Sequence, residues 1–129
     1  MDAMLTLQPQ ENERLGEDLL ANPTAIDRSH LARYTFGDAD LEAEILTLFV
    51  DQSMSLLQQL RAADSQAAWQ FATHSIKGSA RAVGAWRVAD VAQGLETMAY
   101  DADTVPAALA GLEGAMMCAV GEARRVCNA

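Results

Sequence analysis

The sequence predicts an all-α protein, an up-down antiparallel four-helix bundle with an extra short N-terminal helix. Alanine, the best helix former, occurs 25 times, whereas valine and isoleucine, which favour strands, together occur only 10 times. Apolar residues recur at helical spacing through most of the chain. Short turns separate these stretches, and short turns join antiparallel neighbours in a bundle.

The chain divides into a leader and one helical domain. Residues 1–25 are rich in polar side chains and predict a leader or linker with room for one partly formed helix. The domain is expected to cover 26–129. Its helices should span, in order, about 26–34, 39–63, 66–83, 85–100 and from 104 towards the C-terminus.

Residues typical of helix ends mark these boundaries. The expected N-caps accept hydrogen bonds from the first free amides, and a glycine suits the left-handed conformation that ends a helix. The N-cap candidates are Asp38 or Asp40, Asp64 with Ser65, and Thr104, while Gly84 is expected to end the helix over 66–83.

Charge and composition exclude several classes of function. The net charge of −9 disfavours binding to nucleic acid or anionic lipid. No apolar run approaches the roughly 18 residues that span a bilayer, and the N-terminus lacks a signal-peptide pattern, so a cytoplasmic protein is expected. Two histidines and two cysteines, without metal-ligand spacing, predict neither a metal site nor a disulfide. No broad apolar stripe demands a dimer, so a monomer is expected.

The helix expected over 66–83 carries the most informative residues. A helical wheel groups small and apolar residues into a predicted core face. It places Trp69 away from the centre of that face, where the side chain is expected to be partly exposed. Trp69 would then either dock a partner or pack over an adjoining helix. The predicted core face comprises Ala68, Phe71, Ala72, Ser75, Ser79 and Ala82, with Ile76 and Val83 at its margin. A second, polar group comprises Gln70, His74, Lys77, Gly78 and Arg81.

This polar group suggests phosphoryl chemistry at His74. A neutral imidazole is a good nucleophile near physiological pH, and Lys77, the only lysine in the chain, could offset the charge of a phosphoryl group. Gly78 costs about 1 kcal/mol in mid-helix, which close approach by a partner would justify. Arg81 extends the positive stripe, and Gln70 could orient the ring. An ordinary surface histidine, a packing glycine and a solvated lysine explain the same residues about equally well.

The residues from Ala72 to Ala85, which read ATHSIKGSARAVGA, are followed by Leu95-Glu96. This pattern resembles the signature of the histidine-containing phosphotransfer (HPt) domains of multistep two-component relays, and the resemblance covers about residues 26–125. It implies that His74 is the phospho-acceptor, Lys77 its charge partner, Gly78 a clearance position and Gly84 the break before the next helix. Where the family often has another small polar residue after Gly-Ser, this chain has Ala80 and then Arg81, a departure that bears on partner choice.

The resemblance also implies the partners. Such a domain accepts a phosphoryl group from a receiver-domain aspartate and passes it to another receiver, of a response regulator or a hybrid histidine kinase. It has no ATP site and is not an autonomous kinase, and this chain has no Gly-rich nucleotide loop. The receiver brings the aspartate and Mg²⁺, so no cofactor is expected here. Gln70, Gly78, Arg81 and Trp69 are the expected partner-binding residues.

The remaining alternatives come from other classes. One is an interaction module that binds and inhibits a receiver or kinase without carrying phosphate. The other is an unrelated helical enzyme, which the scattered carboxylates do not support. His30 has no lysine or glycine at helical spacing, and a structural or surface role is expected for it.

Overall fold

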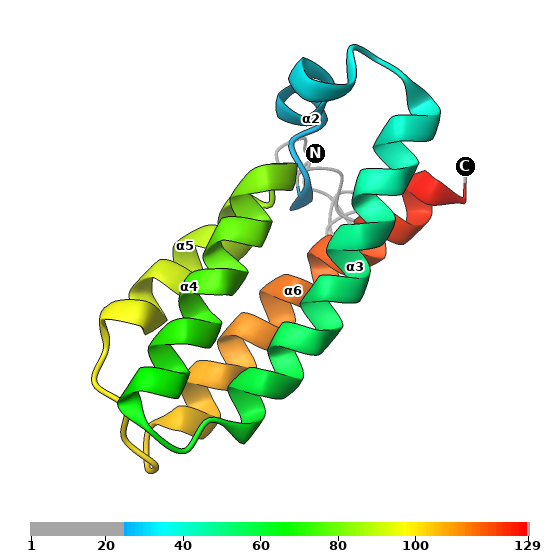
Figure 1. Cartoon of the computed structure of the whole chain (residues 1–129). Helices are drawn as coiled ribbons and strands as arrows, with labels where there is room; N and C mark the ends of the chain where they lie inside the picture. Colours follow the sequence, from blue (N-terminus) through cyan, green and yellow to red (C-terminus); the bar gives the residue numbers. More distant parts are fainter. Residues whose placement is uncertain (1–24, 129) are drawn as a thin grey trace, which may run out of the picture.

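A computed structural model describes residues 25–128 and consists of helices joined by short turns (Figure 1). The expected leader falls almost wholly outside this range. Within it the chain forms no strand, which confirms the all-α prediction. The helices are α2 (Arg28–Thr35), α3 (Ala39–Ala62), α4 (Gln66–Val83), α5 (Trp86–Thr97) and α6 (Val105–Cys127).

Four of these helices form the predicted up-down bundle. Each of α3, α4, α5 and α6 packs against its neighbour in sequence, and α6 packs back against α3 to close the ring. The short helix α2 covers one end of the bundle, where it contacts α3 and α4. No helix within residues 25–128 combines the length and hydropathy needed to cross a membrane.

Side-chain caps begin three of the five helices in the described residues, α2, α3 and α4. Asp38, rather than Asp40, caps α3, because its side chain accepts hydrogen bonds from two backbone amides of the first turn. Ser65 caps α4, as expected. The expected cap at Thr104 is wrong in its chemistry: Thr104 precedes α6, but its hydroxyl donates to the Asp101 carbonyl and caps no amide.

Gly84 ends α4 and holds the start of α2 against that end. Its φ of +77° is the left-handed conformation that glycine adopts without strain. Its carbonyl accepts the Asp27 amide at 2.9 Å, and a Cβ at Gly84 would lie 2.8 Å from Asp27 Cβ. Asp27 in turn caps α2 and accepts the Trp86 indole N–H at 2.9 Å, a hydrogen bond that is the main cause of its lowered pKa. The predicted break at Gly84 is therefore confirmed, and it is also a docking point for α2.

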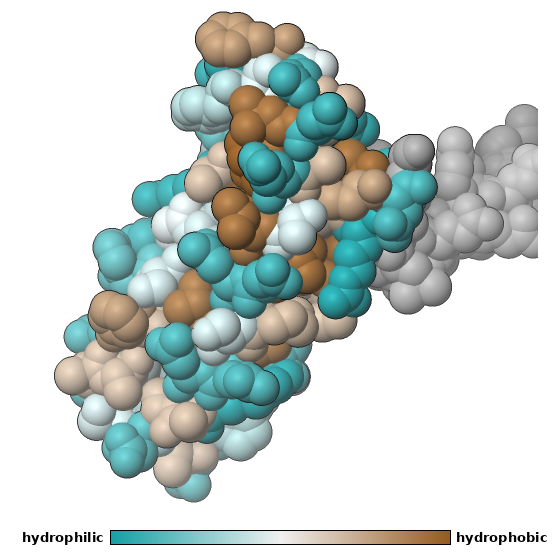
Figure 2. Space-filling model, turned by 45° about the vertical axis from the view of Figure 1, so that its right-hand side comes forward, coloured by the Kyte–Doolittle hydropathy of each residue, from teal (hydrophilic) through white to brown (hydrophobic). Residues whose placement is uncertain are grey.

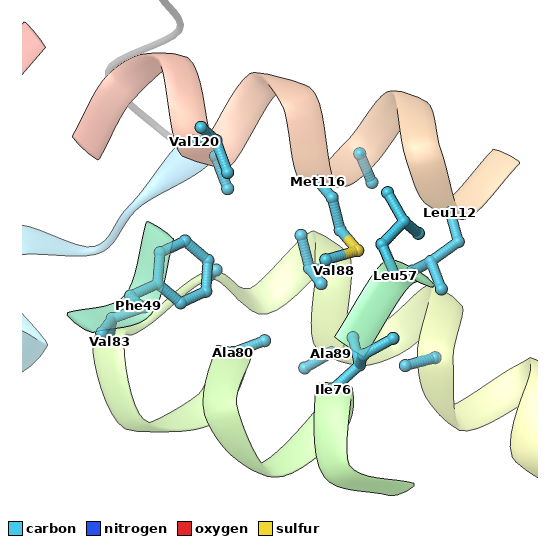
Figure 3. Packing of buried hydrophobic residues seen from close by; sticks show 14 of the residues in the cluster. Phe49, Leu57, Ile76, Ala80, Val83, Val88, Ala89, Leu112, Met116 and Val120 are labelled. Atoms are coloured by element: carbon cyan, nitrogen blue, oxygen red, sulfur yellow. The ribbon is translucent and has the colours of Figure 1, made fainter. Parts of the chain in front are cut away.

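The core runs along the bundle axis and receives a different face of α4 from the one predicted (Figure 3). The prediction centred on small residues, and the observed face is rotated by about one residue, roughly 100°. Phe71, assigned to the core, is 65% exposed, and Ala82 is also exposed. Large side chains decide the orientation because they bury the most apolar area. The buried residues of α4 are Trp69, Ala72, Thr73, Ile76, Ala80 and Val83.

Trp69 corrects the second expectation for this helix. Its side chain is 0% exposed, so the expected partial exposure and docking role are wrong, and the alternative, packing against an adjoining helix, is confirmed. The indole Nε1 donates to the Leu95 carbonyl at 2.8 Å, and the ring packs against Tyr100 with centroids 5.8 Å apart. A buried indole that finds a carbonyl partner fills the core at no unsatisfied polar cost, which explains why Trp69 lies inside.

Candidate functional site

His74 lies on the exposed side of α4, at the seam with α5. Its side chain is 67% exposed. The ring Nδ1 lies 2.8 Å from Glu96 Oε2, which projects from the last turn of α5. The histidine is thus open to solvent and held through one ring nitrogen.

Lys77 approaches the same carboxylate from one turn further along α4. Its Nζ donates to Glu96 Oε1 at 2.6 Å and to Gln93 Oε1 at 3.0 Å. Only 12% of the Lys77 side chain is exposed. Glu96 therefore bridges the two residues, with one carboxylate oxygen on the histidine and the other on the ammonium.

The turn at Gly84 brings these four residues together. His74 and Lys77 lie ten and seven residues before it, and Glu96 and Gln93 lie twelve and nine residues after it. In an antiparallel helix pair, residues at similar distances from the connecting turn lie opposite each other. The register of α5 on α4 thus determines which carboxylate meets the histidine.

The charge of Glu96 determines which ring nitrogen of His74 carries the hydrogen. The hydrogen bond from Lys77, and then that from His74, hold the pKa of Glu96 below its ordinary 4.5. An ionised carboxylate only accepts hydrogen bonds, so Nδ1 must be the donor. In the neutral imidazole the other nitrogen, Nε2, then carries the lone pair. Nε2 is therefore the ring nitrogen that is left with a free lone pair.

The rest of the predicted polar group faces solvent around His74. Gln70, Gly78 and Arg81 are all exposed. A Cβ at Gly78 would meet nothing within 4 Å, so no contact inside the described part of the protein requires a glycine there. Within residues 25–128 the ring is held by Glu96, and Gln70 makes no side-chain hydrogen bond to it, which corrects the orienting role suggested for Gln70.

Two features of this surface were missed from the sequence. Glu96 was noted only as part of the Leu95-Glu96 motif, although its distance from Gly84 could have placed it opposite His74. Phe71 is exposed one turn before His74 and adds an apolar group beside the ring.

Figure 2 shows one face of the molecule, on which hydrophobic and hydrophilic surface are interspersed. Other exposed large hydrophobic residues are spread over the bundle. They are Tyr34, Phe36, Leu41, Leu48, Trp86 and Met117.

His30, expected to be structural or on the surface, lies away from this group, in the aromatic contact that holds α2. Its ring packs edge-on against Tyr34 and Trp86, with centroid distances of 5.2 Å and 4.8 Å. Its packing between two aromatic rings is that of a structural residue.

The site is thus an exposed histidine, held by a carboxylate, on the surface of a four-helix bundle. Residues 44–125 match the family model described as Hpt domain, which covers more than half of the 129-residue chain. The chain therefore belongs to the Hpt domain family, whose members act in histidine phosphotransfer in two-component signalling, and the resemblance seen in the sequence is confirmed. Comparisons with curated proteins and with solved structures gave no match.

Proposed function

We propose that His74 accepts a phosphoryl group from the aspartyl phosphate of one receiver domain and passes it to the aspartate of another. The observation that carries this proposal is that the His74 ring is exposed while only one of its nitrogens has a hydrogen-bond partner among residues 25–128. Its side chain is 67% exposed, while Nδ1 is engaged by Glu96 at 2.8 Å. Nε2 is the nitrogen left for attack, and a lone pair on an exposed atom is what an incoming phosphoryl group requires.

The transfer is an in-line displacement at phosphorus. The Nε2 lone pair forms the N–P bond as the bond from phosphorus to the aspartyl oxygen breaks, and the receiver's carboxylate leaves with that electron pair. The ring then carries hydrogen on Nδ1 and phosphorus on Nε2, and so gains positive charge. The same bonds form and break in reverse when a second receiver's carboxylate attacks.

Glu96 and Lys77 support this step without reaching phosphorus. The Glu96 carboxylate, 2.8 Å from Nδ1, stabilises the positive charge that develops on the ring. Lys77 keeps that carboxylate ionised and fixed, through its 2.6 Å contact with Oε1. We therefore assign both as positioning residues, and Lys77 acts first on Glu96 rather than directly on the phosphate.

In this proposal the receiver supplies the metal ion for the transfer. Within residues 25–128 no cluster of three or more His, Cys, Asp or Glu side chains is arranged to hold a metal ion. We place the Mg²⁺ expected for phosphoryl transfer on the receiver's carboxylates. Gln70, Phe71 and Gly78 lie around His74 and would form the surface on which the receiver docks. We further propose that the protein acts as a monomer in the cytoplasm.

The test is phosphoryl transfer from a panel of radiolabelled receiver domains. Wild type should take up label that is stable in base and lost in acid, and His74→Gln should fold and take up none. His30→Gln, which removes the other histidine, should be labelled like wild type. Receiver binding without label would favour the inhibitory interaction module. Label on His74→Gln would refute the assignment of the acceptor.

A further inference from the structure

We propose that Arg81 is the cation that contacts the phosphoryl group once it is on His74, and that Lys77 is not. This inference rests on the proposed function of His74. It concerns the phosphorylated state, in which about two negative charges are added beside the Glu96 carboxylate. Some positive group must offset that charge if the phosphorylated form is to accumulate.

Lys77, the obvious candidate by sequence, is already engaged. Its Nζ makes two hydrogen bonds, at 2.6 Å to Glu96 and at 3.0 Å to Gln93, and its side chain is only 12% exposed. Turning Lys77 towards a phosphoryl group would break its ion pair with Glu96. The same movement would remove the interaction that keeps the carboxylate on Nδ1.

Arg81 is exposed and makes no side-chain hydrogen bond or ion pair with any of the residues 25–128. Three other arginines of the bundle are committed to carboxylates: Arg28 to Glu42, Arg61 to Glu113 and Arg125 to Glu122. Arg81 can therefore bind a new anion without giving up an existing partner.

Helix geometry directs Arg81 towards His74. The two residues are seven apart, which on an α-helix means about 20° apart in direction and about 10.5 Å apart along the axis. Long side chains on a helix extend towards the preceding turn. That turn holds Gly78, where no side chain intervenes and the space is open. The guanidinium can thus lie over Gly78, within about one turn of the His74 ring.

The chemistry of the two cations agrees with this assignment. A guanidinium presents a planar fork of donors that pairs with two phosphoryl oxygens at once, whereas an ammonium acts as a point charge. Gly78 then has a second role, because any side chain there would separate Arg81 from the phosphoryl group. Arg81 favours the phosphorylated state of His74 over the phosphorylated receiver.

The experiment phosphorylates wild type, Arg81→Gln, Arg81→Lys and Lys77→Gln with a small-molecule phosphoramidate and follows the ³¹P chemical shift against pH. Arg124→Gln is the matched control, since Arg124 is an exposed arginine on α6, which lies opposite α4 in the ring of helices. A nearby cation lowers the pKa of the phosphoryl group, so Arg81→Gln should raise that pKa, Arg81→Lys should raise it less, and Arg124→Gln should leave it unchanged. Arg81→Gln should also shift the His74–receiver transfer equilibrium about threefold to tenfold towards the receiver.

Two results would overturn the inference while leaving His74 as the acceptor. One is an unchanged phosphoryl pKa in a fully labelled Arg81→Gln. The other is a larger rise in Lys77→Gln than in Arg81→Gln, which would assign the contact to Lys77. Absence of label from wild type with every donor would instead refute both proposals, because no phosphoryl group would be present for Arg81 to bind.

Discussion

Gly78→Ala should make the protein more stable and a poorer phosphotransfer partner. Gly78 lies inside α4, where glycine is less favourable than alanine by about 0.5–1 kcal/mol. An added Cβ would meet nothing within 4 Å, so no clash opposes that gain. The free energy of unfolding should rise by about 0.5–1 kcal/mol, which corresponds to an increase of about 2–5 °C in Tm.

The slower transfer expected of Gly78→Ala arises because the added methyl group enters the open space beside His74. His74 lies four residues before Gly78 on the same exposed side of α4, so a methyl group there projects into the volume that a receiver must enter. The initial rate of transfer from a labelled receiver should fall in Gly78→Ala and fall further in Gly78→Leu. Leucine is a good helix former, so the second variant adds bulk without unfolding the helix.

Gly111→Ala is the matched control for this prediction. Gly111 is an exposed helical glycine on α6, and a Cβ there also meets nothing within 4 Å. It should gain similar stability in thermal unfolding and transfer at the wild-type rate. Destabilisation by Gly78→Ala would refute the reasoning by showing a contact inside the protein, and wild-type transfer by Gly78→Leu would show that clearance is not the reason for the glycine.

Three further predictions concern the supports of the site. Trp69→Ala should cost about 3–5 kcal/mol in urea unfolding, since it empties a fully buried site and removes the indole hydrogen bond to the Leu95 carbonyl, and a small cost with weakened receiver binding would contradict this. Gly84→Ala should cost about 2–5 kcal/mol through its positive φ and its collision with Asp27, whereas Gly37→Ala, with positive φ and open space, should cost only about 1–2 kcal/mol. The pKa of Glu96 is lowered on folding, so its stabilising effect is present above its ordinary pKa of 4.5 and is lost as the pH falls below that value. The difference in stability between wild type and Glu96→Gln should shrink in that acid range, and a difference that persists at lower pH would refute the carboxylate's role.

The order and lengths of the helices followed from the sequence because local signals determine them. The predicted helix over 66–83 matches α4, where Ser65 and Gly84 supply unambiguous ends. Which face of α4 is buried was not predictable from small residues. Alanine and serine are tolerated both inside and outside, so only Trp69, Ile76 and Val83 carried orientation information, and a wheel centred on them would have been correct.

The grouping of His74 with Lys77 and Gly78 followed from one helix, whereas its orienting partner required the register across the turn at Gly84. His74, Lys77 and Gly78 lie on one helix, and fixed helical spacing places them together. Glu96 lies on another helix, so its contact with His74 depends on the register of α5 on α4, which its distance from Gly84 indicates but no spacing within a single helix does. Gln70 was suggested for this role because it is near in sequence, and the structure gives the role to a residue 22 positions away.

The turn between α4 and α5 therefore controls chemistry that takes place ten residues away. Asp27 holds Gly84 through a backbone hydrogen bond and holds Trp86 through its carboxylate, so α2 fixes both ends of the turn. One extra residue in the first turn of α5 would rotate the side chains that follow it by about 100° relative to α4. Glu96 would then leave Nδ1, and Lys77 would lose its partner and become available to other anions. The separate tasks of Lys77 and Arg81 follow from this register, because only a correctly placed Glu96 keeps the lysine away from the phosphoryl group.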